Sequence, residues 1–114
     1  MKLIIALIQP HKLEAVKREL NKNEIYRLTV LDASGYGRQK GQSKYFRGHK
    51  LDSNLINKVE IQIAVNDSFV EAALKGIIDG ARSEEGETGD GKIFVLPIEE
   101  CIRIGDGTRG GEAI

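Results

Sequence analysis

The sequence predicts an α+β fold: a ferredoxin-like βαββαβ sandwich with a long loop between its second and third strands. Two observations support this prediction. Short β-rich segments alternate with two amphipathic helical segments, in the order β-α-β and again β-α-β. A glycine-rich stretch with no apolar period separates the two units. A length of 114 residues is usual for one domain, so residues 1–114 are expected to form a single domain.

The first unit contains a strand, a helix and a second strand. Residues 3–8 are a short apolar run rich in β-branched side chains, as expected for a strand buried on both faces. This strand ends before Pro10, because proline cannot donate a hydrogen bond to a sheet. Residues 12–21 follow as an amphipathic helix, and residues 26–33 alternate in the manner of a second strand. The apolar face of the helix comprises Leu13, Val16 and Leu20.

The second unit repeats this order. Residues 58–65 alternate between apolar and polar side chains, which predicts a third strand with one buried face. Ser68 and Glu71 have the spacing of a capping box, so a second helix is expected to begin there. Gly80 is expected to end this helix or nearly so. Its predicted core face comprises Val70, Ala73, Leu74, Ile77 and Ile78.

The last segment contributes a fourth strand and a tail. Residues 93–96 are apolar and end at Pro97, and residues 102–104 could add a short edge strand. The tail from 105 to 114 contains four glycines and is expected to be mobile in the absence of a ligand. With both helices on one face, the other face of the sheet must meet solvent, a ligand or another copy of the chain.

Charge and composition exclude several classes of protein. The 17 basic and 17 acidic residues give a formal net charge of +0, which argues against a general binder of nucleic acid. The single cysteine, Cys101, excludes an internal disulfide and fits a reducing compartment. Neither a cleavable signal pattern nor a run of 18 apolar residues is found, so a cytoplasmic location is expected.

No catalytic constellation stands out in the sequence. The two histidines, His11 and His49, have no serine or cysteine partner in a recognisable arrangement. Cys101 follows two glutamates and has no basic neighbour, so it is expected to be a packing residue. Ligand spacing of the zinc type is also missing. An enzyme would therefore depend on scattered carboxylates such as Glu60, and a binding protein is favoured.

Two glycine-rich segments are candidates for anion binding. Residues 35–51 carry five cationic side chains and no carboxylate. Gly89-Asp90-Gly91-Lys92 precedes a strand, and consecutive backbone N–H groups there can form a nest for an anion. An ordinary tight turn with an exposed lysine is the alternative. Arg103 suits either a phosphate or a surface salt bridge, and Arg38, Lys92 and Arg103 together would suit a polyphosphate.

Several motifs occur together in a combination typical of one protein family. They are Gly35-Tyr36-Gly37-Arg38-Gln39-Lys40-Gly41, Tyr45-Phe46-Arg47-Gly48, Lys58-Val59-Glu60-Ile61, Gly89-Asp90-Gly91-Lys92-Ile93-Phe94-Val95 and the closing Ala113-Ile114. In these motifs the chain resembles the PII signal-transduction proteins. They are cytoplasmic trimers that report nitrogen, carbon and energy status. The resemblance covers nearly the whole length.

The resemblance implies a homotrimer with three nucleotide sites in the clefts between subunits, where ATP and ADP compete. The glycine turn and its lysine, with two arginines, would hold the phosphates, and further positions would meet the adenine. The implied nucleotide-binding residues are Leu7, Thr29, Gly35, Gly37, Arg38, Ala64, Gly89, Asp90, Gly91, Lys92 and Arg103.

The resemblance also implies that 2-oxoglutarate binds in the presence of ATP and Mg²⁺. The amide oxygen of Gln39 would ligate the Mg²⁺ beside the ATP phosphates, and Lys58 would pair with a carboxylate. The implied 2-oxoglutarate residues are Gln39, Lys40, Gly41 and Lys58. Residues 37–55, 82–91 and 103–114 then correspond to the family's T-loop, B-loop and C-terminal loop.

The implied function is regulatory, with no catalytic residue. The T-loop would contact a partner through Lys44, Tyr45, Arg47, His49 and Leu51. That partner would be an ammonium transporter or a nitrogen-metabolism enzyme or regulator, and only the transporter would bring the protein to a membrane. No nucleic-acid partner is expected. The alternative is a small ferredoxin-like enzyme that hydrolyses ATP or acts as an acylphosphatase.

The chain departs from the family pattern in several places, one of which is His49, where some relatives carry a phosphorylated serine. Leu51 stands where the family tyrosine is commonly modified, so that modification has no hydroxyl to act on. The acidic segment 83–88 is longer than usual, and its carboxylates should weaken ATP binding unless Mg²⁺ offsets them. Gly105 replaces a second family arginine, whose role Arg109 could take.

Overall fold

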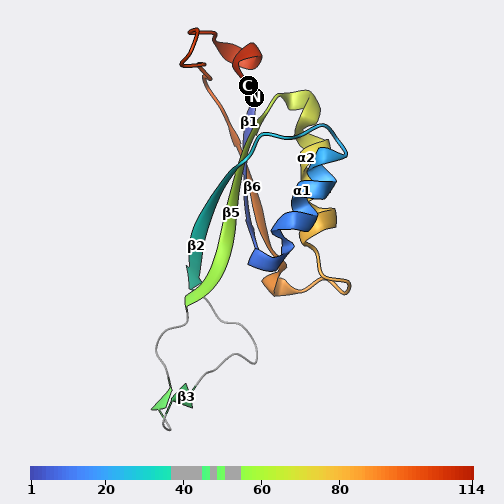
Figure 1. Cartoon of the computed structure of the whole chain (residues 1–114), viewed down its shortest axis with the longest axis vertical. Coiled ribbons are helices and arrows are strands. Elements are labelled where there is room, and N and C mark those ends of the chain that lie inside the picture. The colour runs from blue at the N-terminus through green and yellow to red at the C-terminus, as the bar shows by residue number, and fades with distance from the viewer. Residues whose placement is uncertain (37–44, 47–48, 51–54) are drawn as a thin grey trace.

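The structure is a computed structural model that describes residues 1–36, 45–46, 49–50 and 55–114, with the backbone alone at 45–46 and 49–50. Figure 1 shows how its strands and helices follow one another. The strands are β1 (Lys2–Ile8), β2 (Thr29–Tyr36), β3 (Tyr45–Phe46), β4 (His49–Lys50), β5 (Leu55–Val65) and β6 (Gly91–Pro97). The α-helices are α1 (Leu13–Asn21) and α2 (Val70–Ala81), and the 3-10 helices are η1 (Pro10–Lys12), η2 (Asp67–Phe69), η3 (Thr88–Asp90) and η4 (Gly110–Ala113).

Four strands form one antiparallel sheet in the order β2-β5-β1-β6. Both α-helices lie side by side on the same face of this sheet (Figure 1). The predicted α+β sandwich with a βαββαβ order is therefore confirmed, since β3 and β4 form only a small separate pair. The last pair of β2 and β5, Tyr36 and Leu55, and the turn before β6 lie toward the same end of the sheet.

The core lies between the sheet and the helices. Alternate residues of β1 and β5 point inward, in the period that the sequence predicts for β5. Val16 and Leu20 of α1 and Ile77 of α2 close the core from the other side, and all three are at most 1 % exposed. The buried strand residues are Ile4, Ala6, Ile8, Val59, Ile61, Ile63 and Val65.

The second helix differs from the prediction at its N-terminus and in its core face, while its end at Ala81 lies one residue beyond Gly80, as predicted. Its N-terminus has no side-chain cap: Asp67–Phe69 form a 3-10 turn and the α-helix begins at Val70, so the predicted capping box is wrong. Gly80 lies inside the helix and is buried against α1. Its role is close packing of the two helices, which a sequence pattern cannot reveal. Ile78 is 47 % exposed and does not belong to the core face.

Both boundaries of the second strand also differ from the prediction. The second strand begins at Thr29, three residues later than predicted, because Leu28 packs against the core and does not continue the ladder. It also extends to Tyr36, which pairs with Leu55. The segment 102–104 makes only one bridge, between Ile102 and Arg109, so the edge strand is not formed.

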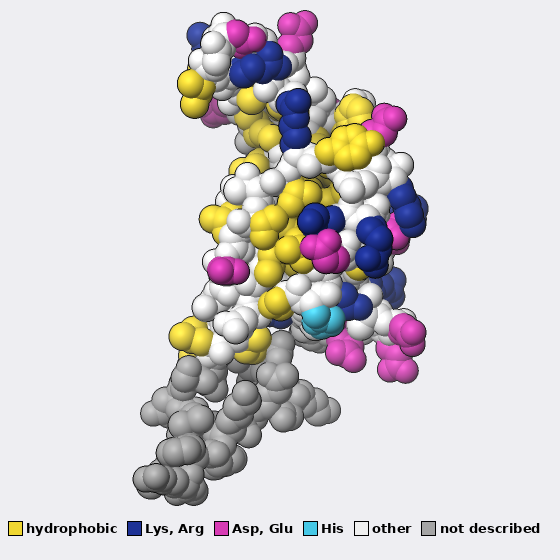
Figure 2. All heavy atoms as spheres, in the orientation of Figure 1, with side chains coloured by type: hydrophobic (Ala, Val, Ile, Leu, Met, Phe, Trp, Pro, Cys, Tyr) yellow, Lys and Arg dark blue, Asp and Glu magenta, His cyan; other side chains and the backbone are white. Residues whose placement is uncertain are grey.

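The sheet face away from the helices is partly apolar. In the view of Figure 2 the helices stand beside the strands, with hydrophobic side chains gathered over the strands and charged side chains over the helices. Phe94 lies opposite Ile5, Leu96 lies opposite Leu3, and both β6 side chains are more than 40 % exposed. Among the described residues, no helix is long and apolar enough to cross a membrane.

Candidate functional site

The glycine turn before β6 is held together by Asp90. Its Oδ2 accepts hydrogen bonds from the Glu87 backbone N–H at 2.9 Å and from the N–H and hydroxyl of Ser83, both at 3.0 Å. Glu87 and Asp90 also form the reciprocal capping box of η3. The Glu87 and Ser83 N–H groups hold the pKa of Asp90 below its ordinary value of 3.8. The aspartate therefore shapes the turn through its charged form.

Gly91 can only be glycine in this fold. Its φ of 124° lies in a region that side chains rarely adopt, and a Cβ there would overlap the carbonyl oxygen of Leu7. This contact fixes the turn against the end of β1. Lys92, the next residue, lies opposite Leu7 in the register of β1 and β6. Lys92 and Leu7 consequently share the helix-free face of the sheet.

Lys58 joins β5 to the same turn. Its Nζ donates a hydrogen bond of 3.0 Å to the Gly89 carbonyl oxygen, which also accepts one of 3.1 Å from Gln9 Nε2. In the part of the chain that the structure describes, no carboxylate lies within 4.0 Å of Lys58 Nζ. Lys58 also lines a pocket of about 400 Å³. The other lining residues are Pro10, Asp32, Ala33, Ser34, Asn57 and Val59.

Arg103 lies in the C-terminal loop and is already engaged there. Its Nη1 donates to Asp106 at 3.0 Å and its Nη2 donates to the Glu112 carbonyl at 2.7 Å. The Thr108 N–H and hydroxyl and then Arg103 hold the pKa of Asp106 below its ordinary value of 3.8. Of the two sequence-based alternatives for Arg103, the surface salt bridge is thus formed in this structure.

Arg109 pairs with Glu100 in the same loop. Its Nη2 donates to the carboxylate at 2.8 Å, and this bond lowers the pKa of Glu100 while raising that of Arg109. Cys101, between Glu100 and the bridge residue Ile102, is partly buried as a free thiol. The loop is closed by hydrogen bonds of its own.

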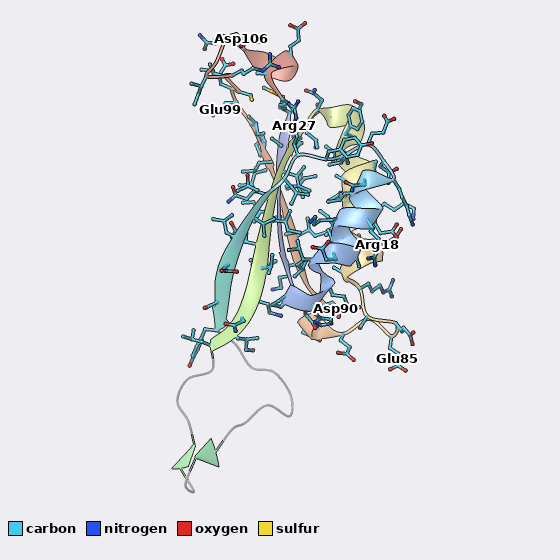
Figure 3. The ribbon with its side chains drawn as sticks, in the orientation of Figure 1. Arg18, Arg27, Glu85, Asp90, Glu99 and Asp106 are labelled. Carbon is cyan, nitrogen blue, oxygen red and sulfur yellow. The ribbon has the colours of Figure 1, made fainter. Side chains whose placement is uncertain are left out.

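The predicted nucleotide residues fall into two groups at opposite ends of the sheet. Figure 3 shows Asp90 at one end and Asp106, from the loop that holds Arg103, at the other. Leu7, Gly35, Gly89, Gly91 and Lys92 accompany Asp90, as the strand register shows. Ala64, opposite Leu3, lies toward the other end, and Thr29 begins β2 on that side. One chain alone does not bring the two groups together.

Many of the predicted loop residues lie outside the described part of the chain. They are Gly37, Arg38, Gln39, Lys40, Gly41, Lys44, Arg47 and Leu51. Tyr45 and His49 are in β3 and β4, where the backbone pairs Phe46 with His49. Among the described residues, no group of three His, Cys, Asp or Glu side chains could hold a metal ion.

Sequence reasoning missed two features of this end of the sheet. One is the capping box of Glu87 and Asp90, whose signal is an acidic residue at each end of a four-residue turn. The other is Gln9, which reaches the turn from the residue after β1. A polar residue between a buried strand and Pro10 is the only local hint of its position.

Comparison with known proteins decides the family. The model for "Nitrogen regulatory protein P-II" matches residues 1–108. The chain belongs to the P-II family of nitrogen regulatory proteins. It is 52 % identical to nitrogen regulatory protein GlnK1 of Methanosarcina mazei, over all of this chain and 97 % of that relative. It is 45 % identical to nitrogen regulatory protein P-II of Azospirillum brasilense, over the full length of both.

A solved P-II structure confirms the fold. The structure of Arabidopsis thaliana PII bound to citrate has a TM-score of 0.77 and 33 % identity, over 98 % of this chain and 87 % of that one. The P-II relatives are regulators of nitrogen metabolism and not enzymes, so this chain is a signal-transduction protein. The alternative of a small hydrolase loses its support.

Proposed function

We propose that this P-II protein is a cytoplasmic homotrimer that senses ATP, ADP and 2-oxoglutarate and controls a nitrogen-metabolism partner. The observation that carries the proposal is Lys58, a cation that lines a pocket, bonds a neutral carbonyl and has no carboxylate within 4.0 Å among the described residues. Such a lysine is available to a carboxylate ligand. The citrate in the Arabidopsis neighbour is a polycarboxylate of this kind.

The nucleotide is proposed to lie between two subunits. Leu7, Gly35, Gly89, Gly91 and Lys92 would come from one subunit, with Arg38 and Gly37 from its loop. Thr29, Ala64 and Arg103 would come from the next. The separation of these two groups within one chain supports an intersubunit site, because one nucleotide cannot reach both ends of a single sheet. Asp90 serves here by holding the turn, since its Oδ2 already accepts three bonds.

2-Oxoglutarate is proposed to bind beside Lys58, with Gln39, Lys40 and Gly41 completing its site. Mg²⁺, when bound, would supply positive charge that offsets the charges of the phosphates and the dicarboxylate. Gln39 would ligate it through the amide oxygen. Lys58 offers a point charge at the wall of the pocket, and this pairs with one carboxylate.

Signalling is proposed to pass through the T-loop, residues 37–55. A ligand shifts this loop only if it binds one loop conformation more tightly than another. The B-loop (82–91) and the C-terminal loop (103–114) would close on the nucleotide. Lys44, Tyr45, Arg47, His49 and Leu51 would contact an ammonium transporter or a nitrogen-metabolism enzyme. Because Leu51 has no hydroxyl, tyrosine modification at this position is excluded.

Isothermal titration of the purified protein tests the proposal. We expect ATP and ADP each to bind, and 2-oxoglutarate to bind only when Mg²⁺ and ATP are present. Lys58→Met should abolish 2-oxoglutarate binding and change the Kd of ADP by less than about threefold. No heat with either nucleotide would contradict the sensor. Equal loss of ADP and 2-oxoglutarate in the variant would contradict the role of Lys58.

A further inference from the structure

The carbonyl oxygen of Gly89 accepts hydrogen bonds from two side chains in distant parts of the chain. Lys58 Nζ donates from β5 at 3.0 Å, and Gln9 Nε2 donates from the residue after β1 at 3.1 Å. Both hydrogen bonds are partly buried. One carbonyl of the B-loop is therefore held by two donors of different chemistry, a cation and a neutral amide.

The strand register explains why both donors reach the same atom. Leu7 lies opposite Glu60 and Ile8 lies opposite Val59 at the end of β1, so Gln9 and Lys58 are the next residues beyond the last pair. On the other side of β1, Ile8 lies opposite Gly91, at the beginning of β6. Side chains alternate along a strand, so Gln9 follows Leu7 onto the helix-free face that Lys58 also occupies.

The two donors differ in their freedom to change partner. Lys58 is charged, lines the pocket and has a long flexible stem, so an entering carboxylate attracts it. Gln9 is neutral and precedes Pro10, which restricts its backbone to the extended region. Its φ of −69° and ψ of 137° lie there. Lys58 is therefore the donor that can leave Gly89, and Gln9 is the donor that stays.

We propose that Gln9 is a positioning residue, which holds the Gly89 carbonyl and with it the B-loop when Lys58 leaves to bind a carboxylate. The proposal rests on the assignment of Lys58 to 2-oxoglutarate made above. Without Gln9, the departure of Lys58 leaves a partly buried carbonyl with no side-chain donor, and this loss lowers the affinity for the dicarboxylate. With Gln9, the dicarboxylate binds while the turn that faces the phosphates keeps its shape.

Titration of Gln9→Met tests the effect on ligands. Methionine keeps the length of the side chain and removes the donor. With Mg²⁺ and ATP present, we expect the Kd of 2-oxoglutarate to rise about tenfold, while the Kd of ADP changes by less than about threefold. Gln62→Met is the matched control, because Gln62 donates to Glu60 and not to the B-loop. An unchanged Kd of 2-oxoglutarate, or equal weakening of both ligands, overturns the proposal.

A second measurement needs no ligand. Lys58→Met imitates the departure of Lys58, and the Asp90 N–H, which donates to the Glu87 carbonyl at 3.1 Å, reports the shape of the turn through hydrogen exchange. We expect protection of this N–H to persist in Lys58→Met and to fall about tenfold when Gln9→Met is added. Equal protection in the single and double variants overturns the holding role. If the wild-type protein binds no ligand, the proposed sensor function is wrong. Failure of that proposal can therefore be distinguished from failure of the role proposed for Gln9.

Discussion

Gly80 of α2 and Val16 of α1 lie so close that a Cβ at position 80 would stand 2.5 Å from the Val16 Cα. The obstruction is backbone, which cannot rotate away as a side-chain end can. The helices that cover the sheet are therefore in contact at a glycine, and their distance from each other depends on it.

Gly80→Ala should destabilise the protein by about 1–3 kcal/mol, because the added methyl group forces the two helices apart. Gly76→Ala is the matched control in the same helix. A Cβ there meets the end of the Leu20 side chain at 3.2 Å, and the gain in helix propensity of about 1 kcal/mol offsets the crowding. Urea unfolding at one fixed protein concentration compares the two. Equal stability of both variants would contradict the contact.

Acidification should open the turn that Asp90 holds. The pKa of Asp90 is lowered in the folded protein, first by the Glu87 N–H and then by Ser83. The stabilisation is therefore present above the unfolded value of about 3.9 and disappears as the pH falls through the lower folded pKa. We expect the Ser83 and Glu87 N–H groups to keep their exchange protection at about pH 4.5. They should lose it as the pH falls through the lowered pKa of Asp90 in the folded protein. In Asp90→Asn this pH dependence should vanish, and its persistence would assign it to another group.

Phe94→Asp should prevent assembly. Phe94 is 49 % exposed on the apolar face opposite Ile5, and a carboxylate there cannot be buried between subunits without a partner. Ile78→Asp on the outer side of α2, where Ile78 is 47 % exposed, should leave the assembly intact. Light scattering after size-exclusion chromatography gives the mass of each. A Phe94→Asp trimer would show that this face does not join the subunits.

Asp106→Asn should strengthen nucleotide binding. Asp106 forms an exposed ion pair of 3.0 Å with Arg103, and a phosphate must break this pair before it can bind the arginine. Exposed pairs are weak, so we expect the Kd of ADP to fall only about threefold. Glu100→Gln breaks the corresponding pair with Arg109 and should leave the Kd unchanged. An equal fall in the Kd of ADP for Glu100→Gln would contradict this expectation. It would indicate that Arg109 binds the nucleotide in place of the family arginine that Gly105 replaces.

The local apolar period was sufficient to predict the buried faces of β5 and α1, because these faces follow regular strand and helix geometry. The alternation of residues 58–65 predicts the buried face of β5, and the apolar positions of α1 predict Val16 and Leu20 in the core. The same kind of pattern fails in β2. Leu28 alternates correctly but packs into the core, and Gly35 enters the strand despite its low propensity because β5 offers a partner.

Long-range contacts account for the remaining differences. Gly80 lies next to the end of α2, as the sequence predicts, but its close contact with Val16, 64 positions earlier, has no sequence signal. The family motifs point to Lys92 and Arg103 together, but only the strand register reveals that they lie at opposite ends of one chain. Gln9 has no motif at all, because its meaning depends on a carbonyl 80 residues away.

The register of β5 has a mechanical consequence. Its pairing with β1 begins at Val59, so residues 55–58 are bonded to β2 alone. A two-stranded ribbon twists more readily than a wider sheet. At Lys58 the four-stranded sheet changes into such a ribbon. A ligand that draws Lys58 away from Gly89 therefore acts at the point where the stiffness of the fold drops. A small rotation there would be amplified along the ribbon toward its last pair, Tyr36 and Leu55.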